Sequence, residues 1–137
     1  MSIRIFLAED NRADVVLIRE ALAVHSVDYE LFVAKDGEEA LRLVAHMGEP
    51  GEMPCPDLLM LDLNLPRVDG IEILQNFRRH PQCARTPVIV VTSSDMPSER
   101  ESAAAFGISR YFRKPASLDA FLELGAVIKE VVAREDG

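Results

Sequence analysis

Short apolar runs alternate with amphipathic stretches from one end of the chain to the other. Five runs have the length of buried strands, and the third, Leu58 to Leu61, is apolar at every position. A continuously apolar strand is typical of a sheet that is covered on both faces. The pattern places strands at Ile3 to Ala8, Tyr29 to Ala34, Asp57 to Asp62, Pro87 to Val91 and Ser109 to Arg113.

A helical pattern follows each strand. In the first, Val15, Ile18 and Leu22 recur at the spacing that puts apolar side chains on one helix face, and a polar cap, Asn11 or Asp10, precedes them. The helices are expected at about Arg12 to Val24, Asp36 to Gly48, Ile71 to His80, Pro97 to Phe106 and Ser117 to Arg134.

Strict alternation of strand and helix implies right-handed crossovers and a parallel sheet with helices on both faces. Five strands suit a flavodoxin-like, doubly wound α/β fold with the strand order 2-1-3-4-5 and five helices. The length of 137 residues and the hydrophobic fraction of 48% fit one domain, 1–137. In open sheets of this kind, ligands bind at the carboxyl ends of the strands.

Acidic side chains gather at these strand ends. Glu9 and Asp10 follow the first strand, and the third strand ends in Asp62. Because the first and third strands are neighbours in the expected order, the carboxylates would converge and repel one another unless a cation lay among them. Mg²⁺ prefers hard oxygen ligands and is usually held by one or two carboxylates with phosphate oxygens. The sequence therefore predicts a magnesium site.

The remaining strand ends carry groups suited to phosphoryl chemistry. A carboxylate such as Asp62 can act as a nucleophile and form an aspartyl phosphate. Negative charge spreads over the oxygens of the transferred phosphoryl group, where a cation and a hydroxyl donor help most. Lys114 could supply the cation, and Thr92 or Ser93 the hydroxyl.

Four segments at these strand ends resemble the motifs of bacterial response regulator receiver domains, and the resemblance covers nearly the whole chain. The segments are Phe6 to Asn11, Leu61 to Pro66 with Asp69-Gly70, Val90 to Ser93, and Tyr111 to Pro115. Each segment alone is a weak signal, but four in order, each at a strand end, are specific. Two positions depart from the family pattern: Glu9 stands where many relatives have Asp, and Ala116 where a bulky aromatic often stands.

The resemblance implies roles in the magnesium site. Asp62 would be the phosphoacceptor and a metal ligand, and Asp10 a direct ligand beside it. The backbone carbonyl of Asn64 would complete the protein ligands, while Glu9 would act on the ion through water.

The resemblance also implies the parts of a switch. Thr92 would be the hydroxyl that turns toward the phosphoryl group, Lys114 the lysine that pairs with it, and Tyr111 the aromatic that changes rotamer on activation. The bond from Lys114 to Pro115 is expected to be cis, a state accessible only because proline follows.

The family implies a response regulator of a two-component phosphorelay, phosphorylated by a sensor histidine kinase. We expect no enzymatic activity beyond self-phosphotransfer and slow autodephosphorylation. The chain resembles most the small regulators of phytochrome-type kinases, at Glu9 to Asn11 with Ala13-Asp14 and at Leu63 to Pro66. It ends at Gly137, just after the last helix, so no output domain is expected and protein contacts would carry the signal.

The readout face would comprise helix four, strand five and helix five. Apolar residues form a broad arc on helix five, wide enough to suggest a homodimer contact besides a core face. The arc contains Phe121, Leu124, Val127, Ile128, Val131 and Val132, with Leu122 beside it.

Composition argues against two classes of partner. The net charge of −8 disfavours binding of nucleic acid and of anionic lipid.

The sequence also bears on where the protein works. No apolar stretch approaches the roughly 20 residues that span a bilayer, and the N-terminus lacks signal-peptide features, so a cytoplasmic location is expected. Cys55 and Cys83 have no metal-ligand spacing; a disulfide between them is possible in principle, but they are interpreted as structural thiols because a cytosolic chain would keep them reduced.

Two rival classes of function remain. An aspartyl-nucleophile phosphatase usually needs a second acid two residues after its nucleophile, where this chain has Asn64, which cannot serve as that acid. A flavodoxin-like cofactor carrier needs a glycine-rich phosphate loop after the first strand, where Glu9 to Asn11 stand instead.

Overall fold

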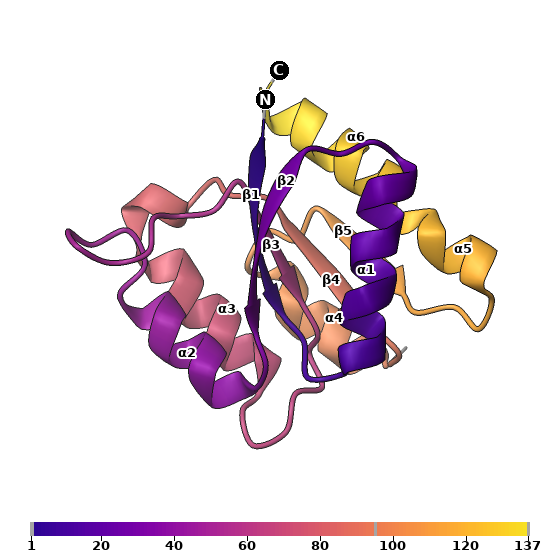
Figure 1. Cartoon of the computed structure of the whole chain (residues 1–137). Helices are drawn as coiled ribbons and strands as arrows, with labels where there is room; N and C mark the ends of the chain where they lie inside the picture. Colours follow the sequence, from indigo (N-terminus) through magenta and orange to yellow (C-terminus); the bar gives the residue numbers. More distant parts are fainter. Residues whose placement is uncertain (1, 95, 137) are drawn as a thin grey trace.

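Five parallel strands form one sheet at the centre of the structure, a computed structural model that describes residues 2–94 and 96–136 (Figure 1). The strands are β1 (Ile3–Ala8), β2 (Tyr29–Ala34), β3 (Leu58–Leu61), β4 (Val88–Thr92) and β5 (Arg110–Arg113). Their order is β2-β1-β3-β4-β5, which confirms the predicted topology. β1 and β3 are neighbours, so their carboxyl ends meet at one edge of the sheet.

Helices cover both faces of the sheet, as Figure 1 shows. They are α1 (Arg12–Val24), α2 (Gly37–Ala45), α3 (Gly70–Arg79), α4 (Pro97–Ala104), α5 (Leu118–Leu122) and α6 (Leu124–Asp136), with a short 3-10 helix η1 (Pro81–Cys83) after α3. Side chains of α2, α3 and α4 pack on one face of the sheet with Phe6 and Ala8 of β1. Those of α1, α5 and α6 pack on the other with Ile5 and Leu7. Successive side chains of β1 thus pack alternately into two hydrophobic cores, one on each face of the sheet.

The predicted fifth helix is divided in two at Glu123. The backbone of Glu123 stays in the right-handed helical region (φ −62°, ψ −17°), so the chain keeps its general course. Just beyond, a Cβ on Gly125 would overlap the carbonyl oxygen of Ala21 in α1. The absence of a side chain at Gly125 therefore lets α6 approach α1 closely, a tertiary contact that helix periodicity does not reveal.

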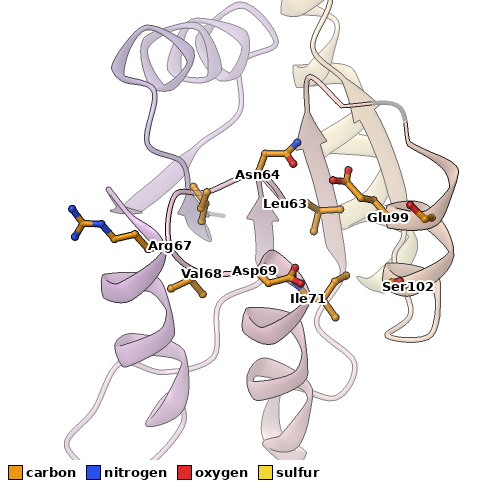
Figure 2. A pocket seen from close by; sticks show the side chains of 10 residues that line it. Leu63, Asn64, Arg67, Val68, Asp69, Ile71, Glu99 and Ser102 are labelled. Atoms are coloured by element: carbon orange, nitrogen blue, oxygen red, sulfur yellow. The ribbon is translucent and has the colours of Figure 1, made fainter.

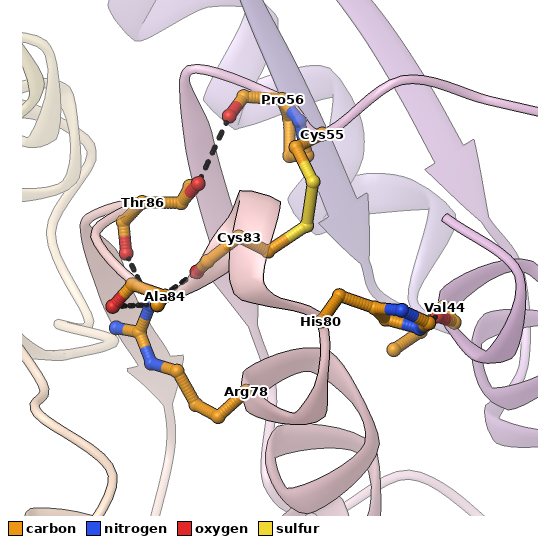
Figure 3. Close-up of a disulfide and its surroundings, with 8 residues drawn as sticks. All are labelled: Val44, Cys55, Pro56, Arg78, His80, Cys83, Ala84 and Thr86. Atoms are coloured by element: carbon orange, nitrogen blue, oxygen red, sulfur yellow. Dashed lines mark hydrogen bonds between the residues drawn. A yellow bond between two sulfur atoms is a disulfide. The ribbon is translucent and has the colours of Figure 1, made fainter. Parts of the chain in front are cut away.

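The interpretation of both cysteines as thiols is wrong for this structure, because Cys55 and Cys83 form a disulfide (Figure 3). They are 28 positions apart in sequence, but the fold brings the segment before β3 beside η1 with a Cα–Cα distance of 5.6 Å. That distance is typical of disulfides. Cys83 is fully buried.

Arg78, at the end of α3, organises the same end of the sheet (Figure 3). Its Nη1 donates to the carbonyl oxygens of Cys83 at 2.8 Å and Thr86 at 2.7 Å. Its Nε donates to the carbonyl oxygen of Phe106 at 2.8 Å, and its Nη2 to that of Gly107 at 3.1 Å. One guanidinium thus links η1 to the segment before β4 and to the loop after α4.

Candidate phosphoacceptor and metal site

The sheet register brings the predicted site residues to one edge. Ala8 of β1 pairs with Leu61 of β3, so Glu9, Asp10 and Asp62 begin at the same level. The Asp62 amide donates to the carbonyl oxygen of Ala8 at 3.1 Å. On the other side, the amide of Lys114 donates to the carbonyl oxygen of Thr92 at 2.8 Å.

Three carboxylates at this edge could hold a metal ion. One ligand oxygen each from Glu9, Asp10 and Asp62 lies within 4.8 Å of the other two. Glu9 and Asp62 are buried, at 2% and 5% exposure, whereas Asp10 is exposed. Glu9 Oε1 is buried, and its close partner is the ammonium group of Lys114. An all-oxygen donor set of clustered carboxylates fits a hard divalent cation such as Mg²⁺.

The ammonium group of Lys114 lies among the same carboxylates. Its Nζ atom is 2.7 Å from Glu9 Oε1, 2.7 Å from Asp14 Oδ2 and 3.0 Å from Asp62 Oδ2. Burial alone would lower the pKa of Lys114, but its bonds to Asp14, Glu9 and Asp62 raise that pKa above the ordinary value. The lysine therefore stays charged at neutral pH.

Burial acts oppositely on the carboxyl group of Glu9. Desolvation raises its pKa from 4.5 to about 7, although the bond to Lys114 and the lysine's charge lower it, and the nearby charge of Asp62 raises it further. Three carboxyl groups, of Glu9, Asp14 and Asp62, surround the single ammonium of Lys114, and this excess of acids favours binding of a cation.

Both carboxylate oxygens of Asp62 are held by donors. Oδ1 accepts from the backbone amide of Asn64 at 2.9 Å, and Oδ2 accepts from Lys114 Nζ at 3.0 Å. These two bonds orient the carboxylate, which is the arrangement that a nucleophile needs.

The hydroxyl of Thr92 is engaged away from Asp62. Its Oγ1 accepts from the side-chain amide of Asn64 at 2.9 Å and from the backbone amide of Ser94 at 3.2 Å. Thr92 is 6% exposed, so these bonds replace ones to water. Before the hydroxyl could turn toward a new group on Asp62, the bond to Asn64 would have to break.

Tyr111 is half-buried and fixed against α4. Its hydroxyl donates to the carbonyl oxygen of Arg100 at 2.9 Å, and the Arg100 guanidinium lies 4.7 Å from the ring centroid. The cavity between Tyr111 and Thr92 measures only about 10 Å³, too small for an aromatic ring. A change of Tyr111 rotamer would therefore require Thr92 or α4 to move.

A family model described as the response regulator receiver domain matches residues 5–125 of the chain. The chain belongs to the response regulator receiver family. Response regulator Rcp1 of Synechocystis sp. (strain ATCC 27184 / PCC 6803 / Kazusa) is 35% identical over 114 residues, which are 83% of this chain and 78% of Rcp1. The receiver spans about half, 54%, of response regulator MprA of Mycobacterium ulcerans (strain Agy99), at 32% identity over 99% of this chain.

Two solved structures of response regulators share both fold and sequence with this receiver. The phosphorylated cyanobacterial phytochrome response regulator RcpA has a TM-score of 0.82 and 36% identity, covering 95% of this chain and 93% of RcpA. The Mn²⁺-bound form of response regulator Rcp1 has a TM-score of 0.80 and 32% identity, covering 93% of this chain and 92% of that one.

A cleft of the receiver lies between the β3–α3 loop, which follows Asp62 in the chain, and α4 (Figure 2). Its volume is about 550 Å³, and its lining includes Asn64, Arg67 and Asp69 from the loop and Glu99 from α4. At its base, a Cβ on Gly70 would come within 2.7 Å of the Leu63 Cα, so glycine allows α3 to start against the loop. The cleft leads from solvent to the Asn64 side chain.

The prediction of a cis bond between Lys114 and Pro115 is wrong for this structure, since the described residues contain no cis peptide bond. The trans form is favoured even before proline, by roughly 0.5–1 kcal/mol.

Two contacts of the receiver were not predicted from sequence. Asp14 was noted as a mark of resemblance, and Asn64 for its backbone carbonyl and as a residue that cannot serve as a phosphatase's second acid, yet their side chains bind Lys114 and Thr92. The position of Asp14, three residues after the cap Asn11, puts it in the first turn of α1. Helix position thus indicates that Asp14 lies near the end of β1, but its contact with Lys114 depends on how α1 packs on the sheet.

Proposed function

We propose that this receiver accepts a phosphoryl group on Asp62 from the phosphohistidine of a sensor histidine kinase, with Mg²⁺ as cofactor. The observation that carries the proposal is the Asp62 carboxylate, buried beside two other acids, with a lysine ammonium 3.0 Å from its Oδ2. The family assignment supports the same conclusion.

In the proposed reaction, a carboxylate oxygen of Asp62 attacks phosphorus. A P–O bond forms while the P–N bond breaks, and the bonding electrons return to the imidazole of the kinase. Lys114 offsets the negative charge that spreads over the phosphoryl oxygens. Asp10, Asp62 and the Asn64 carbonyl would hold Mg²⁺, with Glu9 acting through water. The bound ion would supply further neutralisation of phosphoryl charge.

The signal would follow from a local change of bonding. Thr92 leaves Asn64 and donates to a phosphoryl oxygen, and Tyr111 leaves the carbonyl of Arg100 and moves into the space so vacated. This is a two-state switch biased by added charge. The surface of α4, β5 and α5 changes with it.

The proposal is tested by intact-mass analysis after incubation with a small phosphodonor and Mg²⁺. We expect one added phosphoryl group per chain, none in Asp62→Asn, and at least about a 100-fold slower reaction after chelation of the metal. Asp57→Asn is the control, because Asp57 is an exposed carboxylate bonded to the Arg4 amide, outside the carboxylate cluster. Equal labelling of Asp62→Asn and the unmodified chain would contradict the proposal, as would steady turnover of a phosphate ester.

The donor kinase is proposed to be of the phytochrome type. RcpA is described as a cyanobacterial phytochrome response regulator, and it shares 36% identity with this receiver. A purified, autophosphorylated phytochrome-type kinase should transfer its label at least about tenfold faster than an unrelated histidine kinase, since a docking preference of about 1.4 kcal/mol corresponds to a factor of ten. Equal rates from both kinases would contradict the pairing.

We also propose that the receiver works in the cytoplasm, where a sensor kinase keeps its phosphohistidine. No helix among the described residues is long and apolar enough to cross a membrane. In that compartment glutathione and thioredoxin would act to reduce Cys55–Cys83.

A homodimer through α4, β5 and α5 is a separate proposal. Much of the predicted arc is taken up by the core, since Phe121, Leu124, Ile128 and Val131 are buried. Leu122 remains half-buried, and Leu118 is 54% exposed, so some apolar surface is left for a partner copy. Sedimentation should detect a dimer after phosphorylation; a monomer both with and without the phosphoryl group would contradict it.

A further inference from the structure

The ammonium of Lys114 is divided among three carboxylates. Glu9 Oε1 and Asp14 Oδ2 both lie 2.7 Å from Nζ, and Asp62 Oδ2 lies 3.0 Å from it. An ammonium group has three N–H donors. Every donor is thus matched by an acidic partner, and a new acceptor at this site must displace one of them.

The three partners differ in what else they can bind. Glu9 and Asp62 belong, with Asp10, to the group of described residues whose oxygens could hold one metal ion, and Asp14 lies outside that group. A divalent cation on Glu9 and Asp62 repels an ammonium that is held by the same two carboxylates. Asp14 is the partner that keeps its full charge for Lys114 when the cation binds.

Asp14 is fixed where it can serve this purpose. Its backbone amide donates to Oδ1 of the helix cap Asn11 at 3.1 Å, and it lies in the first turn of α1, where the helix dipole favours an acid. Ile18 and Leu22 of the same helix are fully buried against the sheet. The side chain of Asp14 is only 17% exposed, so its charge is less screened than that of a surface acid.

We propose that Asp14 is a positioning residue for Lys114, which holds the ammonium beside Asp62 while Glu9 and Asp62 turn to a divalent cation. The proposal deepens the proposed function, since the same lysine is to meet the phosphoryl group. The bond to Asp14 is also the first among those that raise the pKa of Lys114, in agreement with this geometry. Without Asp14, Lys114 would compete with the cation for its two remaining partners.

The test is calorimetric titration of the metal-free receiver with Mg²⁺ alone. Asp14→Asn should raise the dissociation constant about five- to tenfold, because the lysine then stays on Glu9 and Asp62. Asp14→Glu, which retains the charge, should restore affinity to within about twofold. Glu20→Gln is the matched control: it removes an exposed charge from the same helix and should change affinity by less than about twofold. Circular dichroism checks that each variant is folded.

A double-mutant cycle with Lys114→Met separates positioning from the general effect of charge. In the Lys114→Met background, Asp14→Asn should change the dissociation constant by less than about twofold, since no ammonium remains to be held. An equal effect of Asp14→Asn in both backgrounds would overturn the proposal, and so would an unchanged dissociation constant in Asp14→Asn alone.

Together with the phosphorylation assay, the double-mutant cycle distinguishes failure of this inference from failure of the proposed function. If the cycle behaves as expected but the unmodified receiver takes no phosphoryl group from a small donor, the phosphorelay fails and the role of Asp14 in metal binding stands. If phosphorylation occurs without coupling between Asp14 and Lys114, the inference fails alone.

Discussion

The two ends of the sheet hold their cations in contrasting ways. At the amino end of β4, Arg78 donates to neutral backbone carbonyls of several segments, and Cys55–Cys83 links the same region covalently. At the carboxyl end, Lys114 is divided among the carboxylates of Glu9, Asp14 and Asp62. The arginine network has one well-satisfied arrangement, whereas we propose that the lysine cluster rearranges when a cation or a phosphoryl group binds. One end maintains the fold and the other can switch.

The largest expected effect concerns the disulfide. Reducing Cys55–Cys83, or replacing both residues by alanine, should lower the free energy of unfolding by about 3–4 kcal/mol, because the bond closes a 28-residue separation in the unfolded chain. Urea titration with and without reductant measures the change. Phosphorylation of Asp62 should keep its rate to within about twofold, since the disulfide lies at the opposite end of the sheet. A free energy of unfolding that does not change with reductant would contradict the contrast between the two ends of the sheet. A large loss of phosphorylation after reduction would also contradict it.

The second effect concerns pH at the carboxyl end. Folding raises the pKa of Glu9 from 4.5 to about 7, so between these values the folded chain keeps a proton that the unfolded chain has released. The contribution of Glu9 to stability is therefore present below pH 4.5 and is lost as pH rises through 7, by on the order of 2 kcal/mol.

Chemical denaturation across this pH range, in the unmodified chain and in Glu9→Gln, isolates the effect because other titrating groups cancel in the difference. Mg²⁺ should reduce the difference, since the ion favours the carboxylate form of Glu9. A difference that is flat with pH would mean that Glu9 is not desolvated.

The smallest expected effect concerns the hydrogen bond between the Asn64 side chain and Thr92. Asn64→Ala removes the donor to Thr92 Oγ1, and the freed hydroxyl should favour the phosphorylated arrangement by about 1 kcal/mol, near the value of one hydrogen bond. The phosphoryl group should consequently last longer by a factor of about 5, which the decay of intact mass reports.

Asn76→Ala provides the control for Asn64→Ala. The side-chain amide of Asn76 donates to the carbonyl oxygen of Glu72 at 2.9 Å in an exposed hydrogen bond of α3, so Asn76→Ala removes an amide that does not contact Thr92. Identical decay in both variants would contradict the role given to the Asn64 side chain.

The alternation of apolar runs and polar strand ends in the sequence was sufficient to predict the sheet and most residues of the candidate site. Glu9, Asp10, Asp62, Thr92 and Lys114 stand at strand ends, and parallel register brings such ends together whatever the intervening helices contain. These residues therefore came together where the order 2-1-3-4-5 places them.

The missed features are tertiary contacts rather than patterns. Cys55 meets Cys83 only because the fold lays η1 against the segment before β3. Asp14 reaches Lys114 only because α1 packs at one angle on the sheet, and the division at Glu123 accompanies the close approach of Gly125 to α1. Periodicity reports which face of an element is buried, but not the angle or distance at which two elements meet.

The central claim is that the carboxyl-end cluster rearranges around a phosphoryl group on Asp62. A crystal structure with Mg²⁺ and beryllofluoride, a mimic of the phosphoryl group, tests it most directly. The account predicts the mimic on Asp62, Lys114 Nζ within hydrogen-bond distance of a fluorine and of Asp14, and the Thr92 hydroxyl moved from Asn64 to the mimic. A mimic bound elsewhere, or an unchanged cluster in which Lys114 still bridges Glu9 and Asp62, would contradict it.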